Sequence, residues 1–241
     1  MHANSQKLIR DLKGILEFYQ AIGIKRLPVR SVPCRMRPEL NRDSASFCKP
    51  LTKGDKKNAL AALRADIGDC TRCKLSHKRT HIVFGEGNPA ARLMFIGEAP
   101  GREEDIQGKP FVGDAGTVLT RLINKMGFQR EDVYIANIVK CRPPMNRDPE
   151  IDEIEQCRNF LERQIEIIQP EVIMSLGRVS AMTLAGDMKL KITAIRGKFF
   201  VYKGIPVMPT FHPAYLIRNP KDKWLTWNDA QKVLEKLENK A

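Results

Sequence analysis

Apolar residues in the second part of the chain gather in four short runs, separated by longer stretches with helical spacing. The runs cover residues 92–97, 133–139, 172–176 and 207–211. Near-continuous apolar runs of this length are typical of strands that are buried on both faces of a parallel sheet. The spacing of other apolar positions predicts helices over residues 55–67, 115–126, 152–168, 179–184 and 227–238.

This alternation of strands and helices predicts an α/β fold. We expect a three-layer α/β/α sandwich with a central four-stranded parallel sheet, spanning residues 55–241. Loops at the carboxyl ends of such strands form the ligand site in sheets of this kind. The segment 198–206, with Lys203 and Gly204 at its centre, predicts a hairpin that leads into the fourth strand.

The first part of the chain, residues 1–54, has a different pattern. Residues 5–22 place apolar side chains on one helical face, which predicts an amphipathic helix. Residues 26–50 lose this periodicity and carry four prolines, which indicates a linker or an extended arm. The first fifty residues hold ten Lys and Arg against four Asp and Glu. This arm either contacts DNA or a partner protein, or is a solvated extension.

Composition limits the classes of protein that this chain can represent. It has 241 residues, 42% of them hydrophobic, which is enough for one core and an appendage. The formal net charge of +13 suits a polyanionic partner, although many basic proteins bind no nucleic acid. No stretch approaches the roughly 20 apolar residues of a membrane span, and the N-terminus is too charged for a signal peptide. We therefore expect a cytoplasmic protein with no membrane partner.

The cysteines indicate a metal centre without deciding its kind. Cys34 and Cys48 lie in the arm and have no predicted role. The other four come from three segments of the expected domain: Cys70, Cys73, Cys141 and Cys157. Four such thiolates can hold a 4Fe–4S cluster, whereas no second CxxC pair or nearby HxxxH completes an ordinary zinc finger. Iron–sulfur, zinc and unliganded thiols in the core all remain open on spacing alone.

The loop after the first predicted strand combines glycine, proline and acidic residues. It reads GEAPGREED at 97–105 and PFVGD at 110–114. Two glycines around a proline let the backbone pass close to a ligand, and Asp114 is the predicted N-cap of the next helix. The loop lacks the GxGxxG and GKS/GKT patterns of nucleotide-binding loops. It is either a ligand loop or an acidic surface loop.

Two further strand ends carry polar or aromatic groups. Asn137 ends the second strand, where its amide can read the edge of a base or satisfy the neighbouring backbone. The fourth strand runs into FHPAYLIRNP at 211–220. An isolated histidine is more often structural, but His212 is expected to share the strand-end face with Asn137 and Glu98. Together these positions favour a functional site.

At these residues the sequence resembles a known family. The segments GEAPGREED, GKPFVGDAG, NIVKCRPPMNR and FHPAYLIRNP, preceded by CxxCxL and VFGEGNP, are similar to the successive motifs of the family-4 (iron–sulfur) uracil-DNA glycosylases. The resemblance covers residues 58–238. It implies a DNA-repair glycosylase that flips uracil out of DNA and hydrolyses its N-glycosidic bond, leaving an abasic site in base excision repair.

The resemblance also implies roles for the residues that match the family's motifs. Phe111 would stack on the flipped uracil, Asn137 would pair with its edge and reject cytosine, and His212 would donate to uracil O2 as negative charge develops. Glu98 and Glu104 match acidic positions of the first motif and are the candidates for orienting water. The four ligands of a mainly structural 4Fe–4S cluster would be Cys70, Cys73, Cys141 and Cys157.

Bond cleavage leaves negative charge on the uracil and positive charge on the sugar, so preorganised donors would stabilise the transition state. Backbone N–H groups between Glu98 and Gly101 are candidate donors, which makes Ala99 and Gly101 substrate-binding residues. Ala99 stands where glycosylases with a GQDPY-type motif carry an aspartate. A route through an ion-like transition state, with little dependence on a general base, is therefore favoured.

The DNA itself would contact the loop after the fourth strand. Leu216 or Ile217, beside Tyr215, would fill the space that the flipped base leaves. The predicted phosphate contacts are Arg218, Lys140 and Arg142. We expect a monomer that is nucleoid-associated while on DNA, with a possible replication or repair partner at the N-terminal arm.

Two other functions remain open. One is a related glycosylase with a broader choice of base, and the other is a non-catalytic iron–sulfur module that binds DNA or transfers electrons. A branch that bonds covalently to DNA through a histidine after the second strand is excluded, because residues 143–148 contain no histidine.

Overall fold

The computed structural model describes residues 51–239. The predicted helix at 5–22 and the arm up to residue 50, with Cys34 and Cys48, lie outside the described residues. Among the helices that are described, none is long and apolar enough to cross a membrane.

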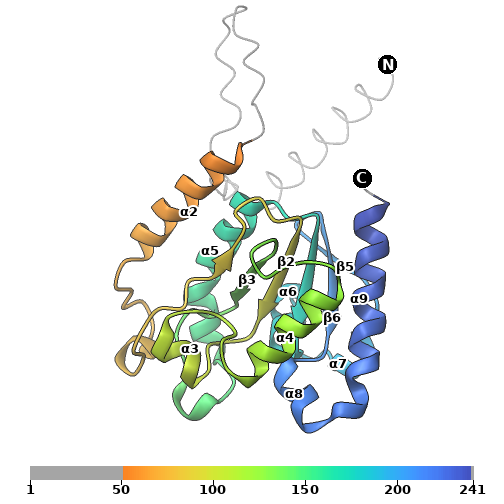
Figure 1. The fold of residues 1–241 in the computed structure, drawn as a ribbon. Helices are drawn as coiled ribbons and strands as arrows, with labels where there is room; N and C mark the ends of the chain where they lie inside the picture. The colour runs from red at the N-terminus through yellow and green to blue at the C-terminus, as the bar shows by residue number, and fades with distance from the viewer. Residues whose placement is uncertain (1–50, 240–241) are drawn as a thin grey trace, which may run out of the picture. The chain divides into compact units, whose positions relative to one another are not determined.

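A mixed six-stranded sheet with the order β1-β3-β2-β4-β6-β5 forms the middle layer (Figure 1). The four inner strands pair in parallel, and each coincides with or overlaps a predicted apolar run. They are β2 (Leu93–Gly97), β3 (Tyr134–Asn137), β4 (Val172–Leu176) and β6 (Ile205–Thr210). The predicted α/β class and the four parallel strands are confirmed.

Two short antiparallel strands add an edge on each side of these four. β5 (Phe200–Tyr202) pairs with β6 and confirms the predicted hairpin. Its turn residues Lys203 and Gly204 both have positive φ, 49° and 82°, as tight two-residue hairpin turns require. β1 (Glu86–Gly87) pairs with β3 and was not predicted, because two residues carry no alternating pattern.

The five longer predicted helices are present, with ends that differ by a few residues. They are α2 (Lys53–Ile67), α4 (Asp114–Lys125), α5 (Ile151–Ile168), α6 (Arg178–Ala185) and α9 (Lys223–Glu238). Three helices too short for a periodic pattern were not predicted: α3 (Arg102–Gln107), α7 (Ile192–Ile195) and α8 (Pro213–Arg218). Short 3₁₀ turns lie at Lys74–His77, Pro144–Asn146 and Pro220–Asp222.

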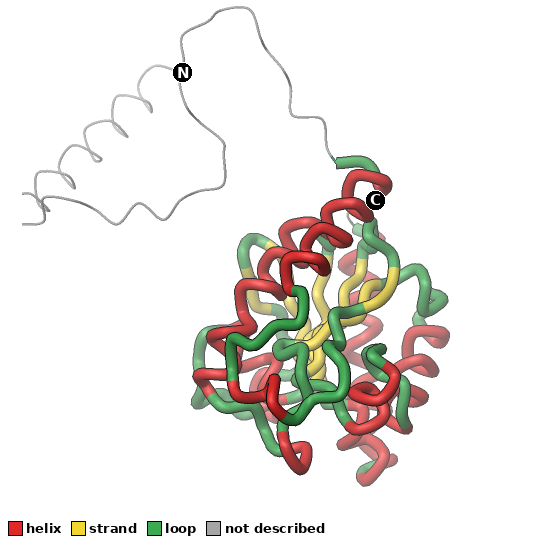
Figure 2. The backbone as a smooth tube through the Cα atoms, turned by 90° about the vertical axis from the view of Figure 1, so that its left-hand side faces the viewer, coloured by secondary structure: helices red, strands yellow, loops and turns green. Residues whose placement is uncertain are grey.

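Alternate side chains of the strands point to opposite faces of the sheet, so that two cores form. Met94 and Ile96 of β2 pack with α2, α5 and α6 on one face, whereas Leu93 and Phe95 pack with α4 and α9 on the other. Figure 2 shows the strands between helices on both sides. Both faces are therefore covered, which explains why the strands read as continuous apolar runs.

Two helix ends test the predicted caps. α2 ends at Gly68 as expected and begins with a capping box between Thr52 and Asp55. The prediction that Asp114 caps α4 is wrong by one residue. Gly113 is the N-cap, and Asp114 lies in the first turn, where its charge still favours the helix dipole.

Candidate active site

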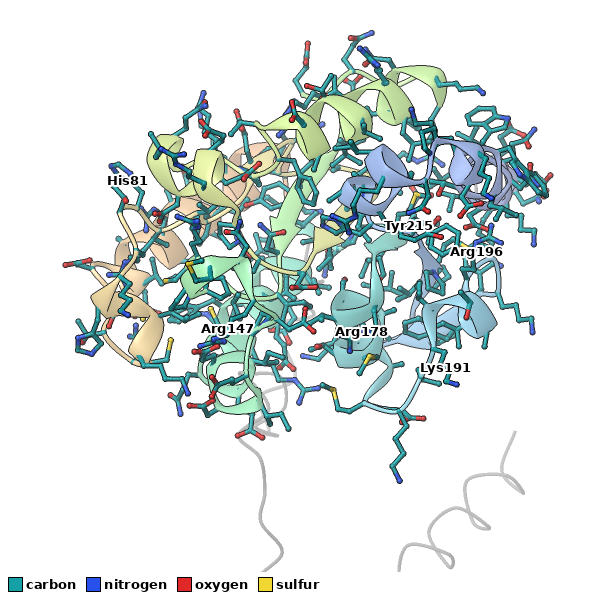
Figure 3. All side chains as sticks on the ribbon, turned by 90° about the horizontal axis from the view of Figure 1, so that it is seen from below. His81, Arg147, Arg178, Lys191, Arg196 and Tyr215 are labelled. Atoms are coloured by element: carbon teal, nitrogen blue, oxygen red, sulfur yellow. The ribbon has the colours of Figure 1, made fainter. Side chains whose placement is uncertain are left out.

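The loops at the carboxyl ends of the parallel strands enclose a cavity of about 620 Å³, within the size range of small-molecule sites. This is the lower end of the sheet in Figure 1, and Figure 3 looks onto it. Most of the predicted site residues line the cavity, although they come from three separate loops: Glu98, Ala99, Gly101, Glu104, Phe111, Asn137, His212, Tyr215 and Arg218.

Asn137 supplies a buried amide at the inner end of the cavity. Its side chain is 1% exposed, and its Oδ1 atom has no hydrogen-bond partner. Gly97 lies beside it in the sheet, where a Cβ atom would fall 2.4 Å from Asn137 Oδ1 and 2.5 Å from Phe111 Cζ. Glycine is therefore required for the amide and the ring to lie together. A buried acceptor without a partner costs about 1–3 kcal/mol, which suits a group that a ligand will satisfy.

The loop that carries Phe111 is strained, and hydrogen bonds to Glu104 hold it in place. Its φ of 52° lies in the left-handed region, which is unusual for an aromatic residue. Glu104 ties this loop to α3: its Oε1 accepts from the N–H groups of Val112 and Gly113 at 3.0 and 3.1 Å, and its Oε2 accepts from Gly101 N–H at 3.1 Å. The aromatic ring is thereby fixed before any ligand arrives.

These contacts revise two sequence expectations. Both carboxylate oxygens of Glu104 are engaged with backbone N–H groups, so Glu104 positions the loop and is not placed as a free group for orienting water. The Gly101 N–H is donated to Glu104 and is not available as a donor to a ligand. Of the four residues from Glu98 to Gly101, Pro100 has no N–H. The backbone donors to consider are thus those of Glu98 and Ala99.

His212 faces the cavity as a neutral donor. It is the N-cap of α8, and its Nδ1 accepts from Ala214 N–H at 3.2 Å, which leaves the proton on Nε2. Burial lowers the pKa of His212 to about 4, with Glu104 raising it and Arg218 lowering it further. The His212 ring centroid lies 5.8 Å from that of Phe111.

Glu98 is a half-buried acidic group at the cavity wall. Burial, followed by the nearby Asp148 carboxyl, raises the pKa of Glu98 to about 7, while Arg178 opposes this shift. Arg178 in turn forms an ion pair with Asp148. Neither Asp148 nor Arg178 was predicted from the sequence as a site residue. The position of Arg178 next to Gly177, at the carboxyl end of the third parallel strand, was a signal that could have identified it.

The α8 helix carries the residues expected to touch DNA. The Tyr215 ring stacks on Phe211 with a centroid distance of 4.7 Å, and its hydroxyl donates to Asp222 at 2.7 Å. Leu216 is only 3% exposed, so it belongs to the core and is not presented for insertion. Ile217 is 43% exposed and is the apolar side chain that this helix offers to solvent. Arg218 is exposed at the rim of the cavity.

The expectation that Lys140 contacts phosphate is wrong, because its side chain is buried. Lys140 is 1% exposed, and its Nζ donates to the Asn137 carbonyl at 2.9 Å and to Gln164 Oε1 at 2.6 Å. Its backbone N–H donates to Cys157 Sγ at 3.3 Å. Lys140 thus joins the end of β3, which carries Asn137, to α5. Arg142, by contrast, is partly exposed and remains a candidate for phosphate contact.

The four predicted ligand cysteines line one small cavity between α2, α5 and the loop after β3, and none forms a disulfide. Their surroundings are cationic: Arg72 donates to Cys70 Sγ at 3.2 Å, and Arg79 donates to Cys141 Sγ at 3.5 Å. Without a metal, burial raises the pKa of the Cys141 thiol to about 12. In the described part of the chain, no group of three or more His, Cys, Asp or Glu is arranged around a single ion position. The thiols nevertheless fit a multinuclear centre, in which each sulfur binds a different metal atom.

Comparison with known proteins identifies the family. The profile of the uracil DNA glycosylase superfamily matches residues 84–238. The type-4 uracil-DNA glycosylase of Saccharolobus solfataricus is 51% identical over 183 residues, covering 73% of this chain and 85% of the relative. The enzyme of the same name from Thermotoga maritima is 51% identical over 154 residues, covering 64% and 80%. The chain belongs to the type-4 uracil-DNA glycosylases. The one from Sulfurisphaera tokodaii is 45% identical over 186 residues, covering 74% and 84%.

In this type-4 glycosylase, the charge and tautomer of His212 can be tested directly. We expect the ¹⁵N spectrum of His212 to show a neutral imidazole with its proton on Nε2 from pH 8 down to about pH 5. The reason is that burial lowers its pKa and Ala214 N–H occupies Nδ1. The spectrum of the His212→Asn variant assigns the signal. A titration near pH 6.5, or a proton on Nδ1, would contradict the assignment.

Proposed function

We propose that this chain removes uracil from DNA by hydrolysing the N-glycosidic bond of a flipped deoxyuridine. The observation that carries the proposal is the buried amide of Asn137, whose Oδ1 has no hydrogen-bond partner and which lines one cavity with Phe111 and His212. The relatives named above act, by their names, on uracil in DNA. The reaction class is therefore that of a DNA-repair glycosylase in base excision repair.

Base choice would depend on Asn137. The uracil edge presents an N3–H donor beside the O4 acceptor, which matches the Oδ1 and Nδ2 atoms of an amide. Cytosine presents an unprotonated N3 and an amino group, so it would place acceptor against acceptor or donor against donor. A site built to pair with a polar edge rejects the mismatched analogue by about 10⁴–10⁵-fold. Phe111 would stack on the base and orient its edge toward the amide.

His212 would stabilise the leaving group. Negative charge develops on the uracil as the bond breaks, and the Nε2–H of a neutral imidazole is placed to donate to O2. Removing one such preorganised donor typically costs about 10²–10³ in rate. The N–H groups of Glu98 and Ala99 are the backbone donors that would assist. Glu104 acts through Phe111 as a positioning residue.

Glu98 would act on the sugar side of the bond. As an anion it favours the positive charge that develops on the sugar, and it can orient a water toward C1′. Asp148 and Arg178 set the charge around it. The direct role of a general base is small in such an ion-like route, so Glu98 contributes mainly electrostatics and the position of the water.

The duplex would be held at the rim of the cavity. Arg218 and Arg142 would contact phosphates, while Ile217 next to Tyr215 would fill the space that the extruded base leaves. This assignment replaces the expected Leu216, which is buried. The flipped state costs the energy of unstacking the base, which these contacts offset.

The cofactor would be a 4Fe–4S cluster held by Cys70, Cys73, Cys141 and Cys157. When bound, the cluster supplies structural order by joining three segments of the chain near the DNA site, and no step of base release passes through it. The guanidinium groups of Arg72 and Arg79 would balance its negative charge. We further propose a monomer in the cytoplasm, with residues 1–54 available to a replication or repair partner.

The first test of this proposal is the Asn137→Asp variant. A carboxylate repels uracil O4, so we expect the single-turnover rate of uracil release from an oligonucleotide to fall by at least about 10²-fold. Alkaline cleavage of the abasic product measures this rate. The matched control is Asn124→Asp on the exposed surface of α4, which should keep the wild-type rate. Wild-type activity in Asn137→Asp would contradict the assigned pocket.

The second test uses pH. We expect kcat/KM for uracil release to rise between pH 6 and 8, with a midpoint near 7, because Glu98 is protonated and uncharged below its pKa of about 7. His212, with a pKa of about 4, does not titrate in this range. Glu98→Gln should lower the rate and flatten the profile, whereas the exposed Glu103→Gln should do neither. An unchanged profile in Glu98→Gln would remove Glu98 from the reaction.

The third test concerns the cluster. We expect Cys157→Ala to lose most of its iron and its brown colour and to unfold at a lower temperature, because one of four ligands is missing. Iron content per chain and the absorbance of the purified protein measure this. Cys48→Ala, at a cysteine with no predicted role, is the control. Full iron content in Cys157→Ala would exclude this ligand, and zinc in place of iron would favour the alternative metal.

A further inference from the structure

Met145 has a large apolar side chain that does not pack into the core. It is 93% exposed, more than any other exposed large hydrophobic residue of the described part. It lies in the 3₁₀ turn Pro144–Asn146 between β3 and α5. The wedge and phosphate contacts proposed above for α8 and the loop after β3 do not use it.

The turn that carries Met145 is both strained and braced. Met145 and Asn146 have φ values of 55° and 53°, and two successive non-glycine residues in the left-handed region are uncommon. Arg142 Nε donates to Asn146 Oδ1 at 2.8 Å, and Arg147 donates to both carboxylate oxygens of Glu153 at 2.9 and 2.6 Å. The exposure of Met145 is thus imposed by a fixed turn. Strain that the surroundings maintain in this way is characteristic of functional segments.

The turn lies at the mouth of the active-site cavity. The two residues after Met145, Asn146 and Arg147, line that cavity. So does Arg218, the residue after Ile217. The two loops follow β3 and β6, which β2 and β4 separate in the sheet, so they start about 14 Å apart at about 4.8 Å per strand. Figure 3 shows Arg147 and Tyr215 on different sides of the strand ends.

We propose that Met145 is a second DNA-inserting side chain, which packs against the bases on the flank of the flipped nucleotide opposite Ile217. The inference rests on the proposed function, since it assumes that uracil enters this cavity from DNA. A spacing of about 14 Å corresponds to about four nucleotides along a strand at 3.4 Å each. Since Ile217 fills the gap itself, Met145 touches the stack within about four steps of that gap. The cationic Arg142 beside it faces the phosphates, and the apolar tip faces the bases.

The test compares Met145→Ala on one oligonucleotide in two forms, single-stranded and paired with adenine opposite uracil. We expect kcat/KM for uracil release to fall about tenfold on the duplex and to stay within twofold of wild type on the single strand, where no stack has to be opened. Met145→Leu should restore the duplex rate, because an apolar tip of similar size remains. The control is Val201→Ala, which shortens another exposed apolar side chain, on β5 and beside the start of β6.

A fluorescent 2-aminopurine placed in turn one, two, three and four nucleotides from uracil reports the contact itself. Its emission on binding should change with wild-type protein and much less with Met145→Ala. Equal rates for variant and wild type on the duplex would overturn the inference, as would equal losses on both substrates, which indicate a damaged cavity. Absence of uracil release from both substrates by the wild-type protein would instead overturn the proposed function, and this inference with it.

Discussion

The arrangement of this site depends on the hydrogen bonds that the buried ammonium group of Lys140 donates. A buried cation requires hydrogen-bond acceptors, and Lys140 Nζ has two, the Asn137 carbonyl and Gln164 Oε1. Gln164 donates onward to the Phe84 carbonyl and to the Tyr134 hydroxyl. The end of β3, the C-terminal part of α5 and the segment before β1 are therefore tied together at one point. The same stretch of chain carries Asn137, the proposed recognition amide, and Cys141, a proposed cluster ligand.

This connection gives the proposed cluster a physical relation to the uracil pocket that requires no electron transfer. Cys141 and Cys157 lie on the two elements that Lys140 joins, and the Lys140 N–H donates to Cys157 Sγ. Ordering these thiols around a metal centre would restrict β3 and α5 together, and with them the position of Asn137. The rest of the pocket is fixed locally: Gly97 leaves room for the amide and the ring, and Glu104 holds the loop of Phe111.

Much of this could be predicted from sequence, and the errors have identifiable causes. The parallel strands were predictable because both of their faces are covered, and Asn137, His212 and Glu98 were predictable because they stand at strand ends. Lysine is rarely buried, so Lys140, two residues before Arg142, was interpreted as a surface charge. The engagement of Glu104 depends on backbone N–H groups of another loop, which no side-chain pattern reveals.

The assignments on α8 and around Glu98 show the same limit. Leu216 and Ile217 are adjacent and chemically alike, and only the packing of α8 against the core decides which one faces solvent. Asp148 and Arg178 lie thirty positions apart in the chain, and their ion pair exists only because the loops after β3 and β4 meet. The sequence specifies which residue types are present at each strand end, whereas their partners come from the topology of the sheet.

The central claim is that the pocket is formed before substrate arrives, with the Asn137 amide already in position to pair with the uracil edge. A crystal structure with free uracil, compared with one without it, tests this most directly. We expect the uracil edge to lie on the Asn137 amide with its ring on Phe111 and O2 at His212 Nε2. The backbone of these residues should move by less than about 1 Å. Uracil bound elsewhere, or a rearrangement of the Phe111 loop on binding, would contradict a preformed site.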